Sequence, residues 1–185
     1  MVRLAVIVSL ITVSLVLVGC SGRDTAKPQV VITGSDAPVD ANSLYAEGVT
    51  LEEHAGPIGS LMVLKDETML RMALDKYNQI ISKYPTSDKI DDAAFRMAGI
   101  YEYLKDYTNA VKNYQRTYQW NPQTPTTARF KAAYLLDTQL GRRAEALQIY
   151  QDALSRITRS GEHRQWVFYA EQRVKELTGE AKPEP

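Results

Sequence analysis

The side chains that could carry catalytic or metal chemistry are few in this chain, and their spacing does not support it. Its two histidines, His54 and His163, lie far apart, and neither belongs to a His-Glu-x-x-His arrangement. The adjacent acids Asp91 and Asp92 offer a pair for proton transfer, but neighbouring residues of a helix point about 100° apart. Acids in a first helical turn are already favoured by the helix dipole. We therefore expect no catalytic residue, no metal site, no cofactor and no enzymatic activity.

The composition excludes further classes of function. The chain has 185 residues with 22 Lys+Arg and 22 Asp+Glu, so its formal net charge is zero. That balance lacks the basic footprint of a nucleic-acid-binding protein, and no nucleic-acid partner is expected. A single cysteine rules out an internal disulfide framework and a Cys-based metal cluster. The sequence also lacks a Gly-rich phosphate loop, a Gly-x-Ser-x-Gly elbow and calcium-loop spacing.

The one cysteine, Cys20, stands where an apolar N-terminal stretch ends. Residues 4–18 are mostly apolar and follow Arg3, which is the layout of a secretory signal. As a helix they would reach only about 22 Å, and a membrane span needs about 20 apolar residues. The sequence of residues 17–20, Leu-Val-Gly-Cys, resembles the bacterial lipobox. The resemblance implies removal of residues 1–19 and lipid attachment to the Cys20 sulfur. An ordinary cleaved signal followed by an unrelated cysteine is the alternative.

The segments beside the signal peptide have a composition that predicts little regular structure. Residues 20–43, after the lipidated cysteine, are rich in Ser, Gly, Asp, Ala and Pro and are expected to form a flexible tether with a reach of roughly 25 Å. Ser21 follows the cysteine, which by the lipoprotein resemblance implies sorting to the outer membrane. Residues 44–65 are expected to be an irregular or short helical N-terminal cap. The tail, residues 179–185, is expected to be disordered.

An internal repeat predicts the fold of the remaining chain. The pattern Ala-x₃-Tyr-x₂-(Ile or Thr)-x₄-Pro occurs twice with a shift of 37 residues, and a third copy lacks the proline. The three copies are Ala73, Tyr77, Ile80 and Pro85; Ala110, Tyr114, Thr117 and Pro122; and Ala146, Tyr150 and Ala153. Each unit predicts two helices, because the proline stops one helix and the small residues allow close helix approach. We expect helices over residues 88–104, 107–119, 143–159 and 163–178. Ser87 or Asp88 would cap the first, and Thr124-Pro125 would start another after Pro122.

This pattern resembles the tetratricopeptide repeat. The small, aromatic and proline positions of that repeat are filled by Ala98, Tyr101, Ala110, Tyr114 and Pro122. The resemblance implies an all-α fold in which about three tetratricopeptide-type helical hairpins, over residues 66–178, form a short right-handed solenoid with a C-terminal capping helix. The departures are Ala94, where the repeat usually has Trp, and Thr117, where Ala is usual.

A narrower resemblance comes from residues 80–87, followed by the Lys105-Asp106-Tyr107 turn. Together they are similar to the BamD-like outer-membrane assembly lipoproteins and to periplasmic proteins that coordinate the envelope with cell division. The resemblance implies a scaffold at the outer membrane, anchored through Cys20, whose body lies in the periplasm and binds periplasmic or outer-membrane proteins. BamD-like proteins usually carry about five repeats, and this chain has room for about three.

In this repeat class the first helix of each hairpin lines the concave face. The corresponding positions are Asp92, Phe95, Gly99, Glu102 and Tyr103 in the central unit, and Thr127, Phe130, Tyr134, Asp137 and Thr138 in the next. We expect a partner-binding face in which aromatics are rimmed by acids, which suits an extended or helical segment with apolar and basic side chains. The alternative is that Phe95 and Phe130 pack between helices.

Two other functions remain open at this stage. The repeat could mediate self-assembly into a larger complex, or the protein could be an accessory subunit that binds peptidoglycan or a small ligand. Trp166, Tyr169 and Val174 lie on one apolar face of the last expected helix. That face would either close the end of the solenoid or dock a partner.

Overall fold

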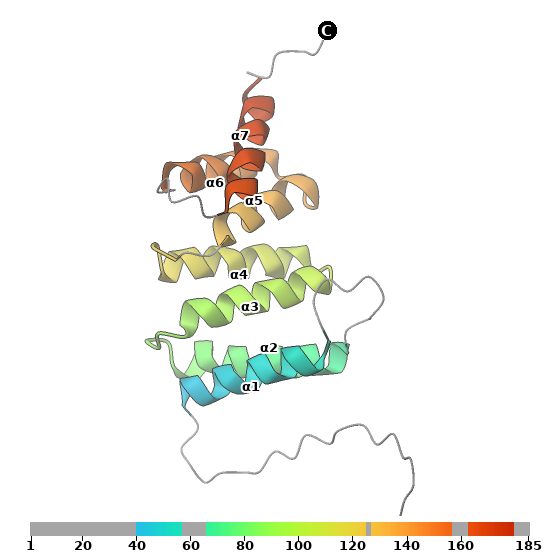
Figure 1. The fold of residues 1–185 in the computed structure, drawn as a ribbon, viewed down its shortest axis with the longest axis vertical. Coiled ribbons are helices and arrows are strands. Elements are labelled where there is room, and N and C mark those ends of the chain that lie inside the picture. Colours follow the sequence, from blue (N-terminus) through green and yellow to red (C-terminus); the bar gives the residue numbers. More distant parts are fainter. Residues whose placement is uncertain (1–39, 57–65, 125–126, 157–162, 180–185) are drawn as a thin grey trace, which may run out of the picture. The chain divides into compact units, whose positions relative to one another are not determined.

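The computed structural model describes residues 40–56, 66–124, 127–156 and 163–179, which form seven α-helices and no strand. The helices are α1 (Ala41–His54), α2 (Glu67–Lys83), α3 (Ile90–Tyr103), α4 (Tyr107–Trp120), α5 (Ala128–Thr138), α6 (Arg143–Arg156) and α7 (Arg164–Thr178). Each helix packs mainly against its neighbours in the chain, so that α1–α2, α3–α4 and α5–α6 form successive hairpins before α7 (Figure 1). The prediction of an all-α repeat of about three hairpins and a C-terminal helix is confirmed.

Several predictions fall outside the described residues. These are the signal peptide (residues 1–19), the lipidation site Cys20, most of the tether and residues 180–185 of the tail. Gly179, the first residue of the predicted tail, ends α7 in the left-handed conformation, with φ of 77°. A glycine takes this conformation at a helix end without the steric cost of a Cβ.

The first helix is longer than the sequence suggested. It begins at Ala41, within the segment assigned to the tether, and its N-cap Asp40 accepts a hydrogen bond from the Ser43 amide at 2.7 Å. It then continues to His54 and packs along α2. The segment expected to be an irregular or short helical cap therefore contains the first helix of a complete first hairpin.

Two helix starts also differ from expectation. The N-cap of α3 is Lys89, whose amide donates to the Ser87 hydroxyl at 3.1 Å, so Ser87 shapes the preceding turn instead of capping the helix. The next helix, α5, begins at Ala128 after Thr127. The Thr124 amide closes a turn onto the Asn121 carbonyl at 3.0 Å, which delays the start beyond Thr124. Pro125 lies outside the described residues.

The repeat tyrosines form the centre of each hairpin. Tyr77, Tyr114 and Tyr150 have no exposed surface, and small residues pack beside them in the same clusters. One cluster joins α1, α2 and the near side of α3, and the other runs from α3 to α7. Each of these rings buries a large apolar surface between the helices, and the tyrosines are the largest fully buried side chains of the core.

One close contact explains a glycine in α1. A Cβ atom on Gly48 would lie 2.5 Å from Cε1 of the buried Tyr77 ring. The equivalent positions in α3 and α5 are Ala98 and Ala133, both fully buried. Only glycine therefore lets the Tyr77 ring lie as close to α1 as it does.

We expect Gly48→Ala to lower the free energy of unfolding of the mature protein by about 1 kcal/mol. Overpacking against Tyr77 costs about 1–3 kcal/mol, which exceeds the gain of up to about 1 kcal/mol in helix propensity. Urea unfolding followed by far-ultraviolet circular dichroism measures the change. An increase in stability would mean that the Tyr77 ring moves aside at little cost, contrary to its packing here.

Candidate protein-binding face

The odd-numbered helices are linked by a recurring polar cluster. Each cluster joins a carboxylate on one odd-numbered helix to a cation on the next odd-numbered helix, and in the first two clusters a tyrosine of the intervening helix also donates to the carboxylate. In the first, the carboxylate Oε1 of Glu52 accepts from the Tyr77 hydroxyl at 2.5 Å and from Nη1 of Arg96 at 3.4 Å. Arg96 also donates through Nε to the Tyr45 hydroxyl at 2.9 Å. Helix α3 is thereby tied to α1.

The second cluster repeats this arrangement one hairpin later. Oε2 of Glu102 accepts from the Tyr114 hydroxyl at 2.6 Å and from Nζ of Lys131 at 3.2 Å. The Lys131 ammonium also lies 5.4 Å from the centre of the Tyr114 ring. Burial, together with the charge and hydrogen bond of Glu102, raises the pKa of Tyr114. The phenol therefore stays protonated and serves as a donor.

The third cluster joins α5 to α7. The carboxylate of Asp137 accepts from Nε and Nη2 of Arg173 at 2.8 and 2.9 Å. The Tyr150 hydroxyl is buried near Tyr169 and does not bind the carboxylate of Asp137. The side chain of Asp137 is only 1% exposed, so this ion pair is the most buried of the three.

Two members of these clusters, Tyr45 and Glu102, lie on the face that the tetratricopeptide resemblance assigns to partner binding. We call it the inner face. Its members are Tyr45, Val49 and Glu53 of α1, Asp92, Phe95, Gly99, Glu102 and Tyr103 of α3, and Tyr134 and Thr138 of α5. All of these residues are exposed or half-buried.

The predicted residues of α3 lie along one side of that helix. Tyr103 is 37% exposed, and Phe95 is half-buried with its ring 5.6 Å from that of Tyr114. Glu102 is held in the second cluster. Asp92 is half-buried and forms no hydrogen bond or close ion pair with the described residues. Burial, and then the charge of Asp91, raise the pKa of Asp92.

The prediction is wrong for two residues of α5, because side chains of α7 cover them. Phe130 is 4% exposed and stacks on Trp166 with ring centres 6.3 Å apart. Asp137 is held by Arg173. The alternative that Phe130 packs between helices is the one that the structure supports, and neither Phe130 nor Asp137 is available to a partner.

The other predicted residues of α5 remain at least partly accessible. Tyr134 is half-buried, and its ring lies edge-on to Trp166 at 5.9 Å and to Tyr169 at 5.7 Å. Thr138 is exposed, and its hydroxyl donates to the Tyr134 carbonyl at 2.8 Å. Thr127 is the half-buried N-cap of α5.

Sequence reasoning missed the α1 side of the inner face and the bridging cations. The signal was a pattern of aromatic, small residue and acid, aromatic-x₂-small-x₃-acid. It occurs as Tyr45-Gly48-Glu52, Phe95-Ala98-Glu102 and Phe130-Ala133-Asp137. The first two copies are 50 residues apart and the last two are 35 apart, so a search at a fixed repeat length passes over α1.

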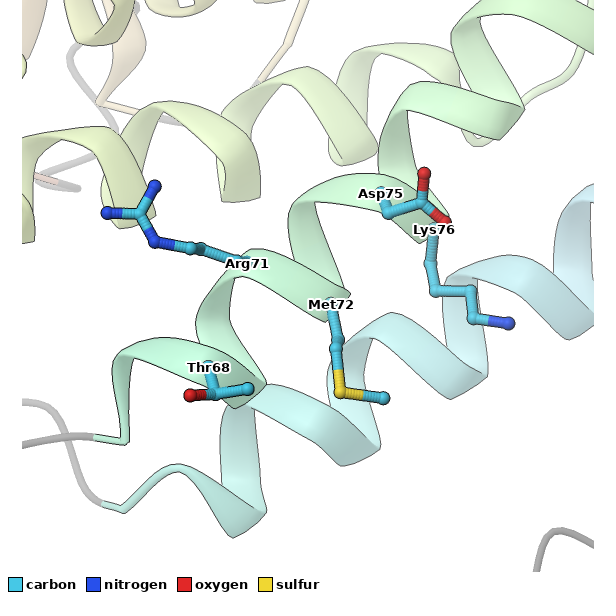
Figure 2. Close-up of a pocket in the computed structure, with 5 residues that line it drawn as sticks. All are labelled: Thr68, Arg71, Met72, Asp75 and Lys76. Atoms are coloured by element: carbon cyan, nitrogen blue, oxygen red, sulfur yellow. The ribbon is translucent and has the colours of Figure 1, made fainter.

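No feature of the described residues suggests a catalytic centre. No group of three or more His, Cys, Asp or Glu side chains there could hold a metal ion. A shallow pocket of about 540 Å³ is lined by Thr68, Arg71, Met72, Asp75 and Lys76. Figure 2 shows that these side chains all come from α2 and do not converge on one point. None of the helices in the described part is both long and apolar enough to cross a membrane.

Comparison with known protein families finds a match for the central part of the chain. Residues 92–122 match the family model described as tetratricopeptide repeat, and this segment contains most of the α3–α4 hairpin. Comparisons with curated proteins and with solved structures gave no match. Repeats of this family indicate a role in protein–protein interaction and are typical of scaffolds without enzymatic activity. The match and the succession of helical hairpins support a tetratricopeptide-repeat protein with an all-α repeat fold.

Proposed function

We propose that this protein is a scaffold of the bacterial envelope, anchored in the outer membrane by lipid on Cys20, that binds a periplasmic or outer-membrane protein on its inner face. Outer-membrane or cell-wall biogenesis is the process that it would serve. The main support for a binding role is that α7 buries the inner face at α5 but not at α1 and α3. Side chains of α7 bury Phe130 of α5, while the equivalent aromatic residues, Phe95 of α3 and Tyr45 of α1, are only half-buried.

The charges of the inner face favour a basic partner segment. The cations Arg96 and Lys131 are already paired with Glu52 and Glu102. The carboxylates of Glu53 and Asp92 have no such pairing with the described residues. The inner face therefore carries a net negative charge beyond its ion pairs, and a partner segment with Lys or Arg and apolar side chains is complementary to this face.

The two ends of the hairpin stack argue against self-assembly by end-to-end stacking. At one end, α1 has Ser43, Glu47 and Thr50 where α3 has Ala93, Met97 and Ile100, which pack against the preceding hairpin. Glu47 is bound to Lys76 of α2 at 2.6 Å. At the other end, α7 has the exposed residues Glu171, Lys175 and Thr178 where α3 has Ala94, Ala98 and Tyr101. A stacked second copy would have to bury these charges.

The anchor is tested by replacing the modified cysteine. In a bacterium with an outer membrane, we expect the full chain to fractionate with that membrane and its residue-20 peptide to carry acyl groups by mass spectrometry. Cys20→Ser should lose both the lipid and the membrane association, because every acyl chain of the anchor is attached to the sulfur or to the amine of residue 20. Ser21→Ala is the matched control and should stay lipidated. A wild-type chain that is soluble in the periplasm without lipid would rule out the anchor.

The binding role is tested by crosslinking in intact cells. A photoreactive residue at position 103 lies on the inner face, and one at Phe168, which is 64% exposed on α7, lies off it. Adducts with envelope proteins from position 103 alone would support the proposal. Self-adducts, chiefly from position 168, would support self-assembly instead. Glycan recovered with the purified body, without protein adducts, would support the accessory role in peptidoglycan binding.

A further inference from the structure

Gly99 is a helix-interior glycine that the packing does not require. It lies in the middle of α3, is half-buried, and a Cβ atom built on it would meet nothing within 4 Å. Glycine destabilises a helix interior relative to alanine. At Gly48 the Tyr77 ring explains the absence of a side chain. At Gly99 no contact of the described residues does so.

The neighbouring helices carry side chains where α3 has none. The positions equivalent to Gly99 are Val49 of α1 and Tyr134 of α5, both half-buried. Arg96 ties α3 to α1, and Lys131 ties α5 to α3. Val49 and Tyr134 therefore flank Gly99 on the two neighbouring helices, and the missing side chain of Gly99 leaves a space between them on the inner face.

Asp92 stands on the same side of α3 as Gly99. It precedes Gly99 by seven residues, or two helical turns, so the two residues lie about 10 Å apart along the helix. Phe95 lies between them and offers an apolar surface. Among the described residues Asp92 has no close ion pair, only longer-range charge interactions with Lys89 and Arg96. An incoming cation therefore stabilises this half-buried carboxylate, because it compensates for the hydration that burial removed.

We propose that Gly99 determines which partner segments bind: it leaves space for one large apolar side chain of the partner, while Asp92 pairs with a Lys or Arg of the same segment. This inference rests on the proposed function and names the chemistry of its partner. In a segment with the polyproline II conformation, which has three residues per turn and rises about 3.1 Å per residue, two side chains on the same side lie about 10 Å apart when they are three residues apart. The preferred segment therefore has the form basic-x-x-apolar or its reverse.

The probe is a random-sequence peptide display library selected on the purified mature protein. We expect the enriched peptides to share a basic residue and a large apolar residue about three positions apart. Gly99→Ala should weaken their binding at least about tenfold, because its methyl group fills the space. The same variant should melt roughly 2–4 °C higher than wild type, because alanine favours the helix. Asp92→Asn should weaken the same peptides and reduce their preference for a basic residue.

Asn78→Ala is the control for helix propensity, since it also places an alanine inside a helix, but at an exposed position of α2 that lies off the inner face. It should raise the melting temperature and leave peptide binding unchanged. If Gly99→Ala binds the enriched peptides as tightly as wild type, the inference about Gly99 fails and the proposed function stands. If no peptide is enriched and position 103 gives no protein adduct in cells, both fail.

Discussion

Tyr114→Ala is expected to lower the free energy of unfolding by about 3–5 kcal/mol, the usual cost of removing a buried aromatic ring. The ring has no exposed surface and packs on Phe95. Its hydroxyl donates to Glu102, and the Lys131 ammonium lies over its face. The substitution therefore leaves a cavity between α3 and α4 and also removes the group that joins Glu102 to the hairpin core.

Urea unfolding of the mature protein measures this loss of stability. Two tyrosine-to-phenylalanine variants separate the contribution of the ring from that of the hydroxyl. Tyr114→Phe keeps the ring and removes the hydrogen bond to the Glu102 carboxylate, so it should cost about 1.5–3 kcal/mol, the usual range for a hydrogen bond to a charged group. Tyr150→Phe should be nearly neutral, because the buried Tyr150 hydroxyl, unlike that of Tyr114, does not bind a carboxylate. Equal losses for the two phenylalanine variants would contradict the role given to the Glu102 cluster.

Arg173→Ala is expected to cost about 3 kcal/mol or more, because it leaves the carboxylate of Asp137 buried without its main partner. Arg173 binds both oxygens of Asp137, whose side chain is 1% exposed. The remaining cation, Arg143, lies 4.0 Å away and is 74% exposed. The helix that detaches should be α7, so Trp166 fluorescence in a Trp120→Phe background should follow the loss.

The control for this variant is an arginine in an exposed ion pair. Arg156 binds Asp152 at 2.7 Å, with both side chains well exposed, and Arg156→Ala should cost less than about 1 kcal/mol. The double variant Asp137→Asn with Arg173→Met should recover most of the loss, since it removes the buried charge along with its partner. If Arg173→Ala costs no more than Arg156→Ala, the pair does not hold α7 in place.

The repeat could be predicted from sequence because its signal is local. Tyr77, Tyr114 and Tyr150 recur at a nearly constant spacing, and their helices lie where that spacing places them. The first hairpin was harder to predict because a longer connection separates α1 from α2, which displaces Glu52 from the repeat length. Gly48 also replaces the alanine that marks the pattern in α3 and α5.

The candidate site was predictable only in part, for a different reason. The helical register of α3 put Asp92, Phe95 and Tyr103 on one side, as the structure does. Nothing in the spacing of Phe130 and Asp137 distinguishes them from their counterparts in α3. Phe130 is covered by Trp166 and Asp137 by Arg173, and in each pair the partner lies 36 residues later in the chain. Such contacts follow from tertiary packing that no local pattern specifies.

The polar clusters also give the stack a direction. The central helix α3 carries a cation, Arg96, and six residues later an acid, Glu102, and α5 repeats this with Lys131 and Asp137. At the same positions, α1 has Ala46 and Glu52, while α7 has Arg173 and is followed directly by Gly179 in place of an acid. A middle hairpin therefore carries both the cation that pairs with the preceding hairpin and the acid that pairs with the following one. The first helix, α1, has only the acid, and the last helix, α7, has only the cation. Duplication of a middle hairpin inside the stack would keep every acid paired with a cation, whereas a hairpin added before α1 or after α7 would lack one partner.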